Sequence, residues 1–118
     1  MDPDRLTEFR DELRQFVRER DWEQFHTPKN VVMALAGEVG ELIAEFQWLT
    51  PEQAAIVMSD EAHGARVRAE IGDVMIYLVG LADTLGIDLV DAARAKLADS
   101  ARRYTVETHR GSVAKAKG

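Results

Sequence analysis

The sequence lacks cysteine, contains no apolar stretch long enough to span a membrane, and has fewer basic than acidic residues. The absence of cysteine excludes disulfides, cysteine-ligated zinc and cysteine nucleophiles. Its 15 lysines and arginines against 21 acidic residues give a formal net charge of −6, which argues against non-specific binding to nucleic acid. The first residues show no signal-peptide pattern, so we expect a cytoplasmic protein that binds neither nucleic acid nor membrane.

Strand-like alternation, internal repeats and low-complexity tracts are also missing, whereas helix signals recur along the chain. Each proline follows a capping residue, at Asp2-Pro3, Thr27-Pro28 and Thr50-Pro51, and predicts a helix start. The expected helices begin near residues 3, 28, 51, 62–65 and 89, and the first four end near residues 20, 48, 58 and 85. These signals predict one all-α domain over residues 1–111, a four-helix bundle with an additional short helix, and a mobile tail at residues 112–118.

The long second and fourth helices are expected to be antiparallel neighbours, because the connection between them is short. We expect each to bury an apolar stripe at helical spacing. The stripe of the second helix is Val32, Leu35, Ala36, Val39, Leu42, Ile43 and Phe46, and that of the fourth includes Val67, Ile71, Val74, Met75, Leu78 and Leu81.

Two short acidic motifs lie in these helices, Glu38-Val39-Gly40-Glu41 and Glu70-Ile71-Gly72-Asp73. The two acids of each motif are three residues apart, so they share one helix face, a turn apart. Carboxylates among apolar residues are costly unless a cation meets them, so we expect all four to converge on a divalent metal. The alternative is a solvated acidic face, which is the usual state of a single helical glutamate.

The acids offer only oxygen, and neither a Glu-x-x-His pair nor a histidine at helical spacing joins them. Zinc and a di-iron site are therefore disfavoured, and Mg²⁺ or Mn²⁺ is expected. Because Mg²⁺ commonly takes its remaining ligands from phosphates, a nucleoside triphosphate is the expected substrate class. Gly37, Gly40 and Gly72 flank the acids, and we expect them either to let two helices approach closely or to leave room for a metal and a ligand.

Trp22, Phe25, His26 and Trp48 gather beside expected helix ends, where they could stack on a nucleobase or simply cap the bundle. Together with the acidic motifs, they resemble the MazG-like all-α nucleoside triphosphate pyrophosphohydrolases, in particular the dCTP pyrophosphatase branch. The resemblance covers about residues 5–112. Its matching segments are Arg20–His26, Gly37–Leu42, Phe46–Trp48, Glu70–Leu78, and Lys96 with Arg103-Tyr104.

The resemblance implies Mg²⁺-dependent hydrolysis of a (deoxy)nucleoside triphosphate, dCTP or a modified dCTP, to the monophosphate and pyrophosphate, in the service of nucleotide-pool sanitation. It implies catalytic metal ligands at Glu38, Glu41, Glu70 and Asp73. The substrate-binding residues that it implies are Trp22, Phe25, His26, Trp48, Asp73, Tyr77, Lys96, Arg103 and Tyr104. Similar family members assemble as dimers or tetramers, so a homo-oligomer is expected.

The sequence departs from the family pattern at a few positions. Ala44 stands where many members carry a further acid, with Glu45 next to it, and Leu13 replaces a histidine of some dCTP-preferring members. Ser100 and Thr105 stand where asparagine and proline are common. The base preference and the acceptor of the proton from the attacking water therefore stay open. The alternatives are another substrate such as dUTP or phosphoribosyl-ATP, a nucleotide sensor without turnover, and a non-catalytic helical interaction module.

Overall fold

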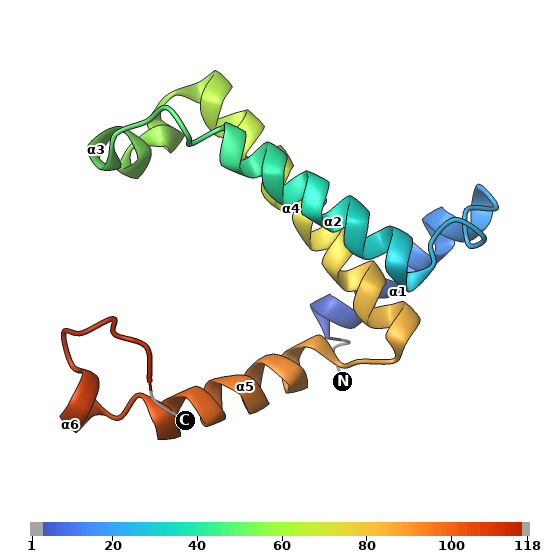
Figure 1. Cartoon of the computed structure of the whole chain (residues 1–118). Helices are drawn as coiled ribbons and strands as arrows, with labels where there is room; N and C mark the ends of the chain where they lie inside the picture. Colours follow the sequence, from blue (N-terminus) through green and yellow to red (C-terminus); the bar gives the residue numbers. More distant parts are fainter. Residues whose placement is uncertain (1–3, 117–118) are drawn as a thin grey trace. The chain divides into compact units, whose positions relative to one another are not determined.

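The computed structural model describes residues 4–116, and every regular element in this range is helical, so the all-α prediction is confirmed. The chain forms two compact units, Met1–Gly86 and Ile87–Gly118. The first unit holds α1 (Arg5–Glu19), α2 (Pro28–Ala44), α3 (Pro51–Ala55), the short 3₁₀ helix η1 (Val57–Ser59) and α4 (Glu61–Leu85), and the second holds α5 (Leu89–Arg103) and α6 (Val106–His109) (Figure 1). Within residues 4–116, no helix has both the length and the apolar character that a membrane crossing requires.

Capping chemistry explains several of the predicted boundaries. Thr50 and Gln53 form the expected capping box at the start of α3. Gly86 ends α4 in the left-handed conformation, with φ of 68°, and Asp88 caps α5 through a 2.9 Å hydrogen bond from the backbone N–H of Asp91. The predicted Asp2-Pro3 cap lies outside the described residues. Within them, the Asp4 side chain caps α1 by accepting from Leu6 N.

Other boundaries were predicted wrongly. Helix α2 ends at Ala44 instead of Trp48, because residues 45–48 form turns. The fourth helix was expected to begin near residues 62–65, and α4 begins slightly earlier, at Glu61, because the Asp60 side chain accepts a 2.9 Å hydrogen bond from His63 N. The third helix divides into α3 and η1, and the short helix α6 was not predicted.

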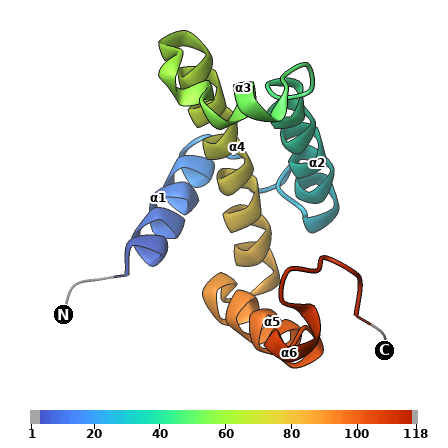
Figure 2. The ribbon, with the colours of Figure 1, turned by 90° about the vertical axis from the view of Figure 1, so that its left-hand side faces the viewer.

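Helices α2 and α4 lie side by side and antiparallel, as expected, and α1 also packs on α4 (Figures 1 and 2). Together with η1 they bury a thin core made of small and β-branched side chains. The buried apolar residues are Val17, Val31, Val57, Val67, Val79 and Ala82. Among the described residues, no side chain has a relative exposure below 2%.

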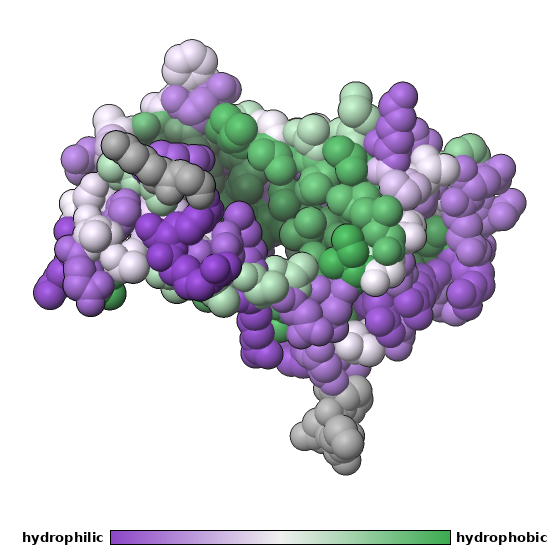
Figure 3. All heavy atoms as spheres, turned by 60° about the horizontal axis from the view of Figure 1, so that its bottom comes forward, coloured by the Kyte–Doolittle hydropathy of each residue, from purple (hydrophilic) through white to green (hydrophobic). Residues whose placement is uncertain are grey.

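The predicted apolar stripe on α2 and α4 is only partly buried in the single chain: Val67 is buried as expected, but many other stripe residues are exposed. On α2, Val32, Val39 and Ile43 are 39–57% exposed, and on α4, Ile71 and Met75 are 54% and 44% exposed. Figure 3 shows apolar side chains gathered over a broad area of one face. The helical pattern identified which faces are apolar, but α2 and α4 contact each other through the neighbouring face, which carries the acids.

Candidate functional site

The four acids of the two motifs meet where α2 and α4 lie side by side. One carboxylate oxygen from each of Glu38, Glu41, Glu70 and Asp73 lies within 4.8 Å of those of the other three. Glu41 is exposed and the others are half-buried. The Oε2 atoms of Glu38 and Glu70 are buried and have no hydrogen-bond partner among the described residues. Like charges this close are unfavourable without a cation between them.

The pKa values of two of these carboxyl groups, Glu38 and Glu70, are raised by their burial and by the crowding. Burial raises the pKa of Glu38, and the neighbouring carboxyl of Glu41 raises it further. Burial also raises the pKa of Glu70, followed by the charge of Glu41. Two orphaned carboxylate oxygens in an all-oxygen donor set fit a hard divalent cation. These four residues can therefore hold a metal ion.

The glycines next to the acids do not mediate a close helix contact within the described part of the chain. A Cβ atom placed on Gly37, Gly40 or Gly72 would meet no heavy atom within 4 Å outside its own surroundings in the helix. The expectation of a close helix contact is therefore wrong for the single chain, and the alternative, room for a metal and a ligand, stays a prediction.

A cavity of about 310 Å³ lies in the first unit among α1, the segment 20–27, the start of α2, and α4. Two of the predicted substrate-binding residues, His26 and Tyr77, line it, and Leu13 and Gly80 form part of its apolar wall. Tyr77 follows Asp73 by four residues on α4, so the cavity begins about one helical turn beyond the acids. Trp22, Phe25 and Trp48 are not among its lining residues.

The segment between α1 and α2 is held in a defined conformation. Asp21 adopts a left-handed conformation with φ of 54°, and the next backbone N–H, that of Trp22, donates to Val17 O at 3.0 Å. The Trp22 ring stacks on His26 with centroids 6.3 Å apart, and the Asn30 side chain donates to Phe25 O at 3.1 Å. Trp22 and Phe25 are 41% and 59% exposed, so an aromatic surface faces outward beside His26.

The remaining predicted binding residues occupy two other places. Trp48 lies in the turn after α2 and is 86% exposed. Lys96, Arg103 and Tyr104 belong to the second unit, where Asp99 lies 3.7 Å from Lys96 Nζ and 3.3 Å from Arg103 Nε. The Tyr104 ring meets His109 edge-on, with centroids 4.9 Å apart.

A cluster that the sequence did not reveal links the end of α2 to the start of α4. Glu45, the neighbour of Ala44, is not one of the four converging acids. Its Oε1 lies 3.0 Å from Arg66 Nε and 3.3 Å from His63 Nε2, and the His63 ring nitrogen is also 2.8 Å from Glu45 O. The one available signal was that Arg66 precedes Glu70 by four residues, on the same helix face.

Comparisons with known proteins identify the family of the chain. The model of the MazG-like family matches residues 33–117. The dCTP pyrophosphatase 1 proteins of Bos taurus and Homo sapiens are 44% and 43% identical to the chain over 101 residues, which are 86% of the chain and about 60% of each relative. A dATP/dGTP diphosphohydrolase of Cyanophage S-2L is 34% identical over 86 residues, 73% of the chain and 66% of the relative. The chain thus spans about 60% of the length of the mammalian relatives it matches.

Among solved structures, a pyrophosphatase from Archaeoglobus fulgidus is similar, with a TM-score of 0.82 and 33% sequence identity. The match covers 89% of this chain and 96% of that one. The chain belongs to the MazG-like family, and the predicted MazG-like fold is confirmed.

Proposed function

We propose that this protein is a Mg²⁺-dependent nucleoside triphosphate pyrophosphohydrolase that converts dCTP, or a modified dCTP, to the monophosphate and pyrophosphate. The observation that carries the proposal is the convergence of four carboxylates, two of them with orphaned buried oxygens, one helical turn from a 310 Å³ cavity. The dCTP pyrophosphatases among the relatives support the substrate. The role would be to clear surplus or damaged nucleotides from the pool in the cytoplasm.

In this proposal Glu38, Glu41, Glu70 and Asp73 hold the metal, which supplies charge neutralisation at the phosphates and lowers the pKa of water. Mn²⁺ would be accepted by the same oxygen ligands. His26 and Tyr77 bind the nucleoside in the cavity, with Trp22, Phe25 and Trp48 offering aromatic faces to the base. Lys96, Arg103 and Tyr104 of the second unit bind the phosphates.

We further propose a homo-oligomer, a dimer or a tetramer, as the active form. The exposed residues Val32, Val39, Ile43, Ile71 and Met75 on α2 and α4 support this, because large contiguous apolar surfaces usually mark an interface. A second copy covering them would add the buried apolar area that the thin core of one chain lacks.

The test is a panel of the four canonical deoxynucleoside triphosphates, dUTP and 5-modified dCTP, each incubated with Mg²⁺ while pyrophosphate release is measured. We expect the fastest release from dCTP or its 5-modified form. The purine nucleotides belong in the panel because the cyanophage relative is named for dATP and dGTP. Absence of pyrophosphate from every nucleotide would contradict the proposal.

A non-catalytic helical module with a solvated acidic face is the alternative from another class. Calorimetric titration with Mn²⁺ separates the two, because only converging ligands give saturable binding at micromolar to millimolar metal. Saturable binding without turnover would instead favour a nucleotide sensor.

A further inference from the structure

Where α2 and α4 face each other, three kinds of residue follow in the same spatial order along both helices: the ion-paired residues, the acids and the residues that line the cavity. On α4, Arg66, Glu70, Asp73, Tyr77 and Gly80 are spaced by three or four residues, so they share one face. Arg66 stands at one end of this row, the acids are in the middle, and the residues of the cavity stand at the other end. Helix α2 and its C-cap residue repeat this order in the antiparallel direction, with Val31 at the cavity, Glu38 and Glu41 in the middle, and Glu45 at the other end.

This order matches the chemical order of a nucleoside triphosphate. With the nucleoside in the cavity and the α-phosphate at the acids, the β- and γ-phosphates extend away from the cavity, toward Arg66. In the proposed hydrolysis water adds to the α-phosphorus, and the bridging oxygen leaves with the diphosphate. Negative charge therefore grows at the end of the row that holds the arginine, where a fixed cation is most useful.

Arg66 has the free hydrogen-bonding capacity that such a role needs. Its one hydrogen bond among the described residues runs from Nε to Glu45 Oε1 at 3.0 Å, so both terminal nitrogens are without a partner there. Its side chain is 57% exposed, whereas that of Glu45 is only 18% exposed. Glu45 is itself fixed by His63, whose Nε2 donates to the Glu45 backbone carbonyl at 2.8 Å and lies 3.3 Å from its carboxylate. Glu45 thus orients the guanidinium and leaves the two terminal amino groups for a ligand.

We propose that Arg66 binds the diphosphate part of the substrate and the pyrophosphate product, with Glu45 and His63 as the residues that position it. This inference rests on the proposed function for the identity of the ligand. It adds a phosphate-binding residue from the first unit that neither the sequence motifs nor the comparisons indicated.

The experiment measures binding of inorganic pyrophosphate and, separately, of dCMP by calorimetry in the presence of Mg²⁺, together with turnover of dCTP. In Arg66→Gln we expect pyrophosphate to bind at least about tenfold more weakly, because two charge-assisted hydrogen bonds are lost. The KM for dCTP should rise by a similar factor, while dCMP binds as in the wild type. Arg68→Gln is the matched control, because it removes the same charge from an exposed position on another face of α4 and should leave pyrophosphate binding unchanged.

Glu45→Gln separates phosphate binding from a purely structural tie between α2 and α4. Because the Gln side chain keeps an oxygen that can accept from Arg66 Nε, this variant preserves the positioning hydrogen bond and removes only the anion beside the guanidinium, so pyrophosphate should bind at least as tightly as to the wild type. If Glu45→Gln weakens pyrophosphate binding as much as Arg66→Gln, or if Arg66→Gln leaves it unchanged, the inference is wrong. Absence of turnover with every nucleotide, alongside Arg66-dependent pyrophosphate binding, would overturn the proposed function and leave the diphosphate site standing.

Discussion

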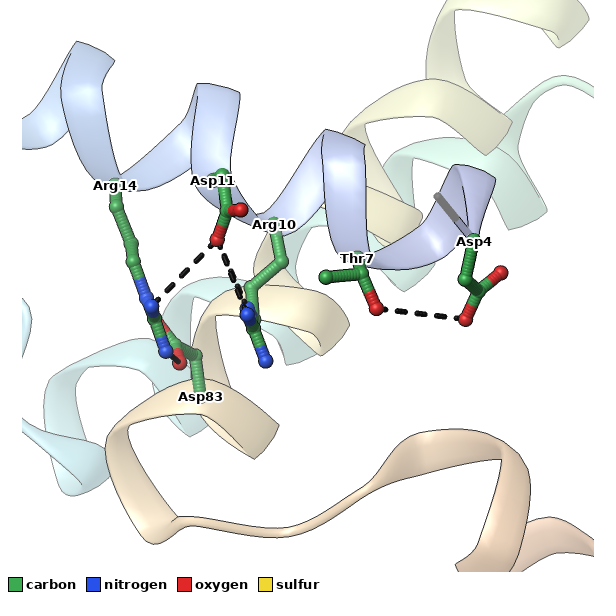
Figure 4. Close-up of polar contacts among 6 residues, drawn as sticks. All are labelled: Asp4, Thr7, Arg10, Asp11, Arg14 and Asp83. Atoms are coloured by element: carbon green, nitrogen blue, oxygen red, sulfur yellow. Dashed lines mark hydrogen bonds and ion pairs between the residues drawn. The ribbon is translucent and has the colours of Figure 1, made fainter. Parts of the chain in front are cut away.

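Arg14 of α1 and Asp83 of α4 form a two-point ion pair at the wall of the cavity (Figure 4). Arg14 Nε donates to Asp83 Oδ2 at 2.8 Å, while Nη2 donates to the other carboxylate oxygen. The hydrogen bond from Arg14 holds the pKa of Asp83 below its ordinary value. The pair fixes the position of α1, and with it Leu13, against the part of α4 that lines the cavity.

Asp83→Asn should therefore lower the free energy of unfolding by about 1 kcal/mol at neutral pH, the upper end for partly exposed pairs. Because the folded-state pKa of Asp83 is lowered, its contribution is present above the ordinary pKa of aspartate and is lost as the pH falls through the folded-state value. Urea unfolding of wild type and variant at several pH values measures both effects. Asp11→Asn, which removes a more distant partner at 3.5 Å from Arg14, is the control and should cost less.

Removing one negative charge from the acidic cluster should abolish turnover and preserve the fold. Glu41→Gln and Asp73→Asn keep the size of the side chain but remove a ligand charge, and even residues behind the ligands of a metal typically affect activity by 10–100-fold. We expect a loss of at least about a hundredfold in kcat/KM. Circular dichroism and urea unfolding check the fold, and Glu12→Gln on α1 controls for the change in net charge. Full activity in both cluster variants would show that the acids are not the site.

The raised pKa values of Glu38 and Glu70 predict a pH dependence of opposite sign to that of Asp83. A carboxyl with a raised folded-state pKa holds its proton more tightly in the folded state. The metal-free protein should therefore be most stable below the ordinary pKa of glutamate and lose stability as the pH rises through the folded-state value. Urea unfolding with a chelator present measures this trend. Glu70→Gln should flatten it and stabilise the metal-free protein at neutral pH, and an equal slope in wild type and variant would contradict the assignment.

The sequence specified the local features of the fold well. The capping box at Thr50 and Gln53, the left-handed stop at Gly86 and the cap at Asp88 depend on neighbouring residues only, and each was predicted correctly. The end of α2 at Ala44 was predicted wrongly, and the carbonyl of the next residue, Glu45, accepts a hydrogen bond from His63, which is distant in the sequence.

The acidic site likewise combines local features, which the sequence predicts, with contacts between residues distant in sequence, which it does not. The three-residue spacing in each motif was enough to predict that the acids share a face, and the structure brings all four together. Periodicity could not tell which face of α2 meets α4, so the buried stripe was assigned to residues such as Ile43 and Ile71 that are more than half exposed in one chain. The arginines Arg14 and Arg66 were missed because their partners are distant in sequence.

If a second copy covers the exposed apolar face of α2 and α4, a charge placed there should dissociate the oligomer. Ile71 is 54% exposed in the single chain, and Ile71→Glu would bury a carboxylate without a partner in the proposed interface. We expect the variant to sediment as a monomer at concentrations where the wild type is a dimer or tetramer. Ala69→Glu, an exposed position two residues away on the same helix, should leave the assembly intact. A monomeric wild type would refute the proposed interface.

Gly80 offers a way to change the cavity without disturbing the fold. A Cβ atom at this position would lie 3.7 Å from Leu13 Cδ2, an ordinary van der Waals contact, so Gly80→Ala is sterically tolerated. Because alanine favours the helix interior, the variant should gain about 1 kcal/mol in unfolding free energy. The added methyl group narrows the cavity, so the KM for the preferred nucleotide should rise roughly tenfold while kcat changes little. Combining Gly80→Ala with Leu13→Val, which shortens the facing side chain, should recover part of the affinity. An unchanged KM in Gly80→Ala would mean that the nucleoside does not occupy this cavity.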